Sequence, residues 1–185
     1  MAGLCVRTDQ TRDPWFSPAG LNRGVISGAL GLPWNPRQSQ RDVLYQASVN
    51  PIVSFPGQGI LLFGDKTATR EPSNLDRINV RRMMIVIEQA IALAAKYTVF
   101  ELNDAATRTA FIGLIDPYLR DIQGRRGLYA YQIVCDNTNN TPEMIDAHQF
   151  QADIYLQPEK SINFIQLNFV LVPTGSNFSE FIGQF

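Results

Sequence analysis

The sequence predicts an α+β fold, in which an α/β-like mixed sheet is flanked by two long helices and followed by a C-terminal antiparallel strand pair and an extended arm. Three observations predict this class. Apolar residues recur at helical spacing over residues 76–97, and a second helical pattern covers 103–123. Short apolar runs bounded by turn residues lie before and after these helices. The chain ends with a long apolar run, a polar hinge and a short phenylalanine-rich segment.

The composition predicts one well-packed domain with a smaller lobe or tail. The chain has 185 residues, of which 45% are hydrophobic and only 18% are charged, against about 25% charged residues in an average domain. A low charged fraction fits a surface covered by neighbouring molecules, and it fits equally an ordinary domain with a polar surface. The net charge of -1 gives no general attraction to nucleic acid or to anionic lipid, so we expect neither as a partner.

The cysteine and histidine content argues against disulfides and metal sites. Cys5 and Cys135 lie far apart and neither belongs to a CxxC motif, so we expect free thiols in a reducing compartment. His148 is the single histidine, which makes a histidine-based metal site unexpected. No apolar run reaches the roughly 18 residues that span a bilayer, and the first residues lack a signal-peptide pattern. We therefore expect assembly in a cytoplasm.

Three parts are expected along the chain. Residues 1–35 are rich in Gly, Pro and Trp, which predicts an irregular segment with a short strand at 25–30. We expect this segment to lead in from an N-terminal region that the sequence does not include. Residues 36–172 form the main domain, and residues 173–185 form the arm.

The main domain begins with a short helix and a hairpin. The helix is predicted over 38–47, where no breaker interrupts the chain. Two apolar strands, 52–55 and 60–63, flank a turn that begins with Pro56 and Gly57.

The helix over 76–97 combines an apolar surface with a basic start. Its apolar residues extend beyond one stripe, which predicts burial on two sides. Cations in the first turns are unfavourable for the helix dipole unless anionic groups face them. We expect these arginines, and a later pair, to form salt bridges with acidic groups of the same or a neighbouring subunit. The residues are Arg77, Arg81, Arg82, Arg125 and Arg126.

A second helix and three strands complete the main domain. The helix covers 103–123, and Pro117 predicts a kink or a break within it. After Gly127 the period changes to that of strands, which we place at 128–135, 150–156 and 162–172. A short helix capped by Thr141 is expected between the first two of these strands.

Two segments resemble ligand sites without meeting their chemical requirements. Gly59–Thr67 nearly matches a phosphate-binding loop, but Asp65 would oppose the phosphates and the four spacer residues are large and apolar. Asp136–Thr141 offers oxygen ligands, but it lacks the glycine and the terminal glutamate of a calcium loop, and Asx turns explain it better. We predict no catalytic residue, no metal site, no cofactor and no enzymatic activity.

The end of the chain is the strongest functional candidate. A terminus does not easily bury several phenylalanines by itself, so we interpret it as an arm that packs on a neighbouring copy or adds a strand to it. The alternative is a terminal helix that folds back on its own domain. The expected hinge is Gly175 with Ser176. The expected subunit-contact residues are Ile162, Phe164, Phe169, Phe178, Phe181, Ile182 and Phe185.

Four segments, in order along the chain, resemble contractile bacteriophage tail sheath proteins. Asp13–Gly20 with the following Arg23 and Gly24 is similar to the family's entry segment, and Asp76–Arg82 resembles its C-terminal domain signature. Residues 95–103 are similar to the stretch after the long helix. Cys135–Thr141, with Ile145 and Asp146, resembles the signature that precedes the closing strands. Together these segments cover most of residues 13–172.

This resemblance implies a structural subunit of the C-terminal sheath region. Such subunits polymerise into stacked hexameric rings around an inner tail tube, and the sheath contracts to drive the tube through the host envelope. The implied partners are other sheath subunits, the tail tube, the baseplate and the tail terminator, and the implied location is the virion tail. Residues 150–156 and 162–172 would receive strands from neighbours, and 178–185 would be the donated arm. The alternative is the sheath of a related bacterial contractile injection or secretion system.

Overall fold

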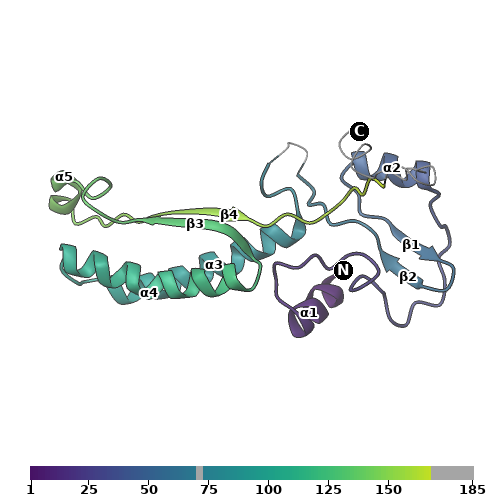
Figure 1. Ribbon diagram of the computed structural model, residues 1–185, viewed down its shortest axis with the longest axis horizontal. Coiled ribbons are helices and arrows are strands. Elements are labelled where there is room, and N and C mark those ends of the chain that lie inside the picture. The colour runs from purple at the N-terminus through teal and green to yellow at the C-terminus, as the bar shows by residue number, and fades with distance from the viewer. Residues whose placement is uncertain (70–72, 168–185) are drawn as a thin grey trace, which may run out of the picture.

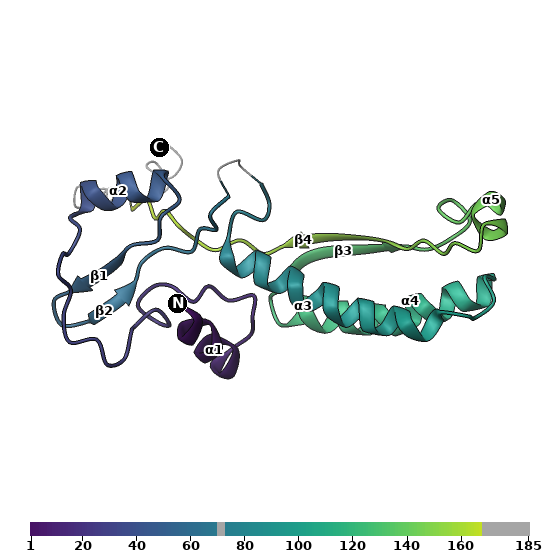
Figure 2. The same cartoon turned by 180° about the vertical axis from the view of Figure 1, so that it is seen from behind.

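The protein is elongated, with two lobes along one long axis (Figures 1 and 2). The computed structural model describes residues 1–69 and 73–167. The N-terminal lobe contains the helices α1 (Ala2–Thr11) and α2 (Gln38–Gln46) and the strands β1 (Ile52–Phe55) and β2 (Gly59–Leu62). The helical lobe contains, in chain order, α3 (Ile78–Ala95), η1 (Lys96–Thr98), α4 (Ala105–Gly124), β3 (Leu128–Val134), α5 (Pro142–Asp146) and β4 (Asp153–Pro158).

The α+β class is confirmed, and the strands of the described residues form two separate two-stranded antiparallel sheets instead of one mixed sheet. β1 and β2 pair through the predicted turn, with Ile52 opposite Leu62 and Phe55 opposite Gly59. Gly57 and Gly59 have positive φ angles, which a residue without Cβ adopts at no steric cost. The three-residue connection is too short for a parallel crossover, so this pair had to be antiparallel.

The C-terminal antiparallel pair is present, but its strands differ from the expected ones. β4 pairs with β3, with Val134 opposite Asp153 and Leu128 opposite Pro158. The expected strand at 162–172 is not formed over 162–167, and its remainder lies outside the described residues. Alternation of apolar and polar residues shows which face a strand buries, but it does not identify the neighbouring strand.

The main hydrophobic core lies between α3, α4 and the β3–β4 sheet. α4 contributes a stripe at helical spacing, which consists of Phe111, Ile115, Leu119 and Ile122. Met83 and Ile87 of α3 and Leu128 of β3 complete the centre of this core. Each such buried side chain stabilises the fold by about 1.5–3 kcal/mol.

The two long helices differ in detail from the prediction. α4 continues through Pro117 without a break. α3 is not buried on two sides, because Ile85 and Leu93 are exposed in the described part of the molecule. The apolar surface of α3 therefore extends beyond the side that packs in the main core.

The first residues form a helix, where the sequence predicts an irregular segment. α1 spans Ala2–Thr11, before the glycines and prolines on which that prediction rested. The expected strand at 25–30 is reduced to one isolated bridge between Val25 and Leu61. The buried Trp15 joins this N-terminal region to the core, and its Nε1 donates a hydrogen bond to the carbonyl oxygen of Arg125 (3.0 Å).

Candidate inter-subunit surfaces

Residues 159–167, the crossing segment, leave β4 and run from the helical lobe to the N-terminal lobe (Figure 1). The Oγ of Ser161 donates a hydrogen bond to the Oδ2 of Asp65 at 2.7 Å. The ring of Phe164 packs edge to face against Tyr45 of α2, with 6.0 Å between the ring centroids. These contacts tie the crossing segment to the N-terminal lobe.

The crossing segment exposes a run of large apolar side chains. Ile162 is 82% exposed and Phe164 is 81% exposed, and Ile165 and Leu167 are exposed as well. Contiguous apolar surface of this kind marks interaction sites in soluble proteins. Two of the expected subunit-contact residues, Ile162 and Phe164, therefore lie together on one exposed segment.

The expected hinge and the other expected contact residues belong to the last part of the chain. Gly175 and Ser176, the expected hinge, lie outside the described residues. The same holds for Phe169, Phe178, Phe181, Ile182 and Phe185.

The β3–β4 sheet has an outer edge on each side in the described part of the chain. It contains two strands among the residues that the structure describes, and one of its faces packs on α4. A two-stranded sheet is marginal on its own, and each outer edge presents N–H and C=O groups that can pair with another strand. The arrangement is suited chemically to accepting an extended chain segment.

Asp65 explains why the segment Gly59–Thr67 is not a phosphate-binding loop. Gly59–Leu62 is strand β2, as expected, and Asp65 is buried beside Arg77, with 3.3 Å between Oδ1 and Nη1. Burial alone lowers the pKa of Arg77, but the hydrogen bond to Tyr45 and the nearby carboxylates raise it overall. The carboxylate of Asp65 is a structural anchor for the start of α3 and for the crossing segment.

Salt bridges account for three of the five arginines for which they were expected. Arg77 pairs with Asp65 and Asp76, so an anionic group does face the first turn of α3. Arg82 pairs with Asp9 of α1, and Arg125 pairs with Asp13 and Asp121. Over residues 1–69 and 73–167, Arg81 and Arg126 form no ion pair.

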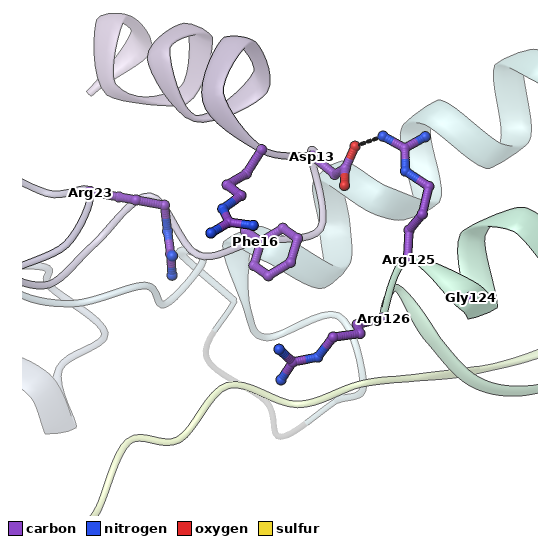
Figure 3. Close-up of a pocket in the computed structure, with 7 residues that line it drawn as sticks. Asp13, Phe16, Arg23, Gly124, Arg125 and Arg126 are labelled. Carbon is purple, nitrogen blue, oxygen red and sulfur yellow. Dashed lines mark hydrogen bonds and ion pairs between the residues drawn. The ribbon is translucent and has the colours of Figure 1, made fainter.

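A basic pocket lies between the segment that follows α1 and the end of α4 (Figure 3). It has a volume of about 410 Å³ and is lined by Arg12, Asp13, Phe16, Arg23, Gly124, Arg125 and Arg126. The guanidinium groups of Arg12 and Arg23 lie 6.0 and 5.5 Å from the centroid of the Phe16 ring. Burial, together with the charge of Arg12, lowers the pKa of Arg23.

Sequence reasoning missed this pocket because its cations come from distant parts of the chain. Arg12 and Arg23 are separated by about a hundred residues from Arg125 and Arg126. The two groups are joined by the hydrogen bond from Trp15 to the carbonyl oxygen of Arg125 and by the ion pair of Arg125 with Asp13, which no local pattern reveals. The paired arginines after α4 were the one visible sign.

The loop after β3 has the predicted Asx turns. The Oδ1 of Asp136 accepts hydrogen bonds from the N–H of Thr138 at 2.8 Å and from its hydroxyl at 2.5 Å. These bonds, the one from the hydroxyl first, lower the pKa of Asp136. Asn140 is buried and exchanges hydrogen bonds with the main chain of Gln151. No group of three or more histidine, cysteine or acidic side chains suited to a metal ion occurs in the described part of the chain.

Within residues 1–69 and 73–167, no helix is long and apolar enough to cross a membrane.

Sequence comparison finds two adjoining family matches. Residues 70–171 match the phage tail sheath C-terminal domain, and residues 1–68 match the phage tail sheath protein central domain. Tail sheath proteins of Vibrio phage KVP40 and Enterobacteria phage T4 are 53% and 49% identical over 183 residues. Each match covers 99% of this chain but only 27% and 28% of the relatives, so the chain spans about a quarter of their length.

Solved structures share the fold over nearly the whole chain. The sheath complex of an extracellular contractile injection system, PVC, in its contracted state matches with a TM-score of 0.85 and 25% identity, over 91% of this chain and 49% of that one. A chain of the baseplate of the anti-feeding prophage AFP matches with a TM-score of 0.84 and 23% identity, over 93% of this chain and 49% of that one. The match to the phage tail sheath C-terminal domain alone covers more than half of the residues of this chain, so the chain belongs to the phage tail sheath family.

Proposed function

We propose that this chain is the inter-subunit part of a contractile tail sheath subunit, which polymerises into stacked hexameric rings around a tail tube. Contraction of that sheath drives the tube through the host envelope. The role is structural, without catalysis or a cofactor. Family membership and the two phage relatives named tail sheath protein support this proposal.

The observation that carries the proposal is an incomplete sheet beside an exposed apolar segment. Among the described residues no further strand pairs with β3 or β4, and the crossing segment that follows β4 exposes Ile162 and Phe164. Strand addition gives affinity through main-chain hydrogen bonds, and pockets for alternate side chains give specificity. In this proposal the acceptor is the β3–β4 sheet, and the donor is the arm over 173–185 of a neighbouring copy.

A flexible connection between acceptor and donor would let rings stay joined while subunits move. Gly175 and Ser176 remain the proposed hinge, because small residues tolerate large changes in backbone angles. Phe178, Phe181, Ile182 and Phe185 remain the proposed anchors of the arm. The extended lattice would store free energy that is released as the contacts between copies rearrange.

The test is deletion of residues 174–185 from the full-length protein, followed by electron microscopy of purified protein. We expect the full-length protein to form polysheaths and the deletion variant to form none, because the rings lose their donated strand. A matched control replaces residues 174–177 with a Gly-Ser segment of equal length, which keeps the arm and should keep the polysheaths. Normal tubes from the deletion variant would refute the arm proposal.

The remaining assignments are part of the same proposal. The partners are other sheath subunits, the tail tube, the baseplate and the tail terminator, with neither nucleic acid nor membrane among them. The protein is assembled in the host cytoplasm and ends in the virion tail. The division into 1–35, 36–172 and 173–185 also stays a proposal, and the two family matches adjoin near residue 69.

The second candidate is the sheath of a related bacterial contractile injection system. The sheath complex of an extracellular contractile injection system matches in fold, at 25% identity. Identity of 53% and 49% with phage proteins favours the phage tail. Mass spectrometry of purified infectious particles distinguishes the two, since a phage sheath co-purifies with packaged genome and capsid.

A further inference from the structure

Opposite charges collect at the two ends of α4. Asp104 is the N-cap residue of this 20-residue helix and Arg125 is its C-cap residue, so they lie about 30 Å apart. The acidic tip, which we define as residues 96–108 and 135–153, contains the cations Lys96 and Arg108. Its six carboxylates belong to Glu101, Asp104, Asp136, Glu143, Asp146 and Asp153.

Hydrogen bonds favour the charged form of four of the tip carboxylates, those of Asp104, Asp136, Glu143 and Asp153. Hydrogen bonds from Thr107 lower the pKa of Asp104, and those from Thr138 lower the pKa of Asp136. A hydrogen bond from Thr141 lowers the pKa of Glu143. No ion pair neutralises any of them among the residues the structure describes.

The buried cation of the acidic tip, Arg108, donates its hydrogen bonds to neutral side chains. The guanidinium of Arg108 donates to the Oδ1 of Asn103 at 3.0 Å and to the Oδ1 of Asn137 at 2.9 Å. Arg108 is buried, so its guanidinium group is not available to a neighbouring molecule. The surface of the tip therefore stays acidic.

Glu101 is the tip carboxylate best placed to meet another molecule. In the described structure its side chain has no hydrogen bond or ion pair. Phe100 on one side is fully exposed, and Leu102 on the other is 76% exposed. Phe100 also has a φ angle of 72°, an uncommon conformation for a residue with a side chain. An unpaired charge between two exposed apolar groups is suited to burial in an interface, where apolar neighbours exclude water from the pair.

The basic pocket has the complementary composition. Arg12 and Arg126 have no carboxylate partner within the described residues, and Arg126 has no hydrogen bond from its side chain there either. Figure 3 shows Arg23, Arg126 and the ring of Phe16 around one open space. Guanidinium groups bind carboxylates through two parallel hydrogen bonds, and the ring offers an apolar wall.

We infer that the acidic tip of one copy docks into the basic pocket of a neighbouring copy, with Glu101 between Arg12 and Arg126. The two sites cannot meet within one copy, because the continuous helix α4 separates them. The contact is therefore head to tail, which repeated over many copies gives a closed ring or an open helix. This inference rests on the proposed sheath function and names one contact that would build it.

The test is a charge swap in the full-length protein, measured as the critical concentration for polysheath formation by sedimentation and electron microscopy. We expect Glu101→Arg alone and Arg126→Glu alone each to raise the critical concentration at least about tenfold, because like charges then face each other. The double variant restores opposite charges at the same place, so its critical concentration should return to near that of the unaltered protein. Raising the salt concentration should weaken assembly of the unaltered protein more than that of a variant with both residues changed to glutamine.

The control is Glu88→Arg, which reverses an exposed carboxylate on α3 away from both sites and should leave assembly unchanged. Circular dichroism melting checks that each variant is folded, and Arg12→Glu is a second pocket variant with an exposed side chain. Assembly of folded Glu101→Arg at the normal concentration would overturn the inference and leave the proposed function intact. The same conclusion follows if the double variant assembles no better than the single ones. Failure of the unaltered protein to form polysheaths would overturn both.

Discussion

Buried polar residues hold the loops of this protein in place. Asp65 lies between Arg77 and Ser161, so one carboxylate joins the start of α3 to the crossing segment. Asn140 does the same at the acidic tip, where its amide accepts from the N–H of Gln151 at 2.9 Å and donates to its carbonyl oxygen at 2.8 Å. Buried polar groups such as these two side chains need partners, since leaving one unpaired costs about 1–3 kcal/mol.

Replacing Asn140 with alanine tests this role. The change leaves both main-chain groups of Gln151 without the partners they have now, so we expect a loss of about 2–4 kcal/mol in the free energy of unfolding. Urea denaturation followed by circular dichroism measures it. Gln89→Ala, at an exposed position of α3, is the control and should change the free energy by no more than about 0.5 kcal/mol. Equal stability of the two variants would contradict the assignment.

At the scale of elements, residues close together in sequence predicted most helices and strands. They did not predict which strands pair with each other. The hairpin of β1 and β2, the start of α4 after Asp104 and the Asx turns after β3 follow from residues close together in sequence. The partner of β4 depends on packing against α4, which lies outside any local window. For the same reason the basic pocket, whose arginines come from residues 12–23 and 125–126, could not be foreseen.

The N-cap of α4 gives a prediction with a defined pH dependence. The Oδ1 of Asp104 accepts from the N–H of Thr107 at 2.8 Å, which lowers the pKa of Asp104 below its ordinary value of 3.8. A lowered pKa in the folded state means that the carboxylate stabilises the fold above that ordinary value, and that the effect is lost as the pH falls through the folded value. Asp104→Ala should therefore lower the Tm at pH 7.

The expected difference in Tm between Asp104→Ala and the unaltered protein shrinks as the pH is brought below the depressed pKa. Thermal melts at pH 7 and at a series of acidic values measure it. Glu88→Ala removes an exposed carboxylate that caps no helix, so its effect on Tm should be smaller at pH 7. A Tm difference for Asp104→Ala that is constant across this pH range would show that the charge plays no part.

At the scale of the whole molecule, the two lobes are joined by segments from both ends of the chain. Trp15 inserts from the N-terminal region into the core of the helical lobe, and the crossing segment returns from β4 to α2. The composition predicted a domain with a smaller lobe but not this exchange of segments. Local patterns contain no information about which distant surface a tryptophan will cover.

The chain contains a matched pair of tryptophans for testing this connection. Trp15 is 8% exposed and Trp34 is 54% exposed. Trp15→Ala should lower the free energy of unfolding by about 3–5 kcal/mol, as expected for a large buried aromatic residue. Trp34→Ala should change it by about 0.5 kcal/mol or less, since an exposed side chain loses few contacts. Denaturation followed by far-UV circular dichroism measures both, and similar losses would contradict the linking role of Trp15.

The unbroken course of α4 through Pro117 has a consequence for the size of an assembly. Under the proposed docking, α4 sets the distance between the two docking sites of one copy. The acidic tip at one end of the helix binds one neighbour, and the basic pocket at the other end binds the next. The step between copies would then be set by about 30 Å of rigid helix and would not depend on loops. Because the length of α4 is fixed, every copy has the same spacing to its neighbours. A regular tube requires this equal spacing, even when the flexible connections between copies change shape.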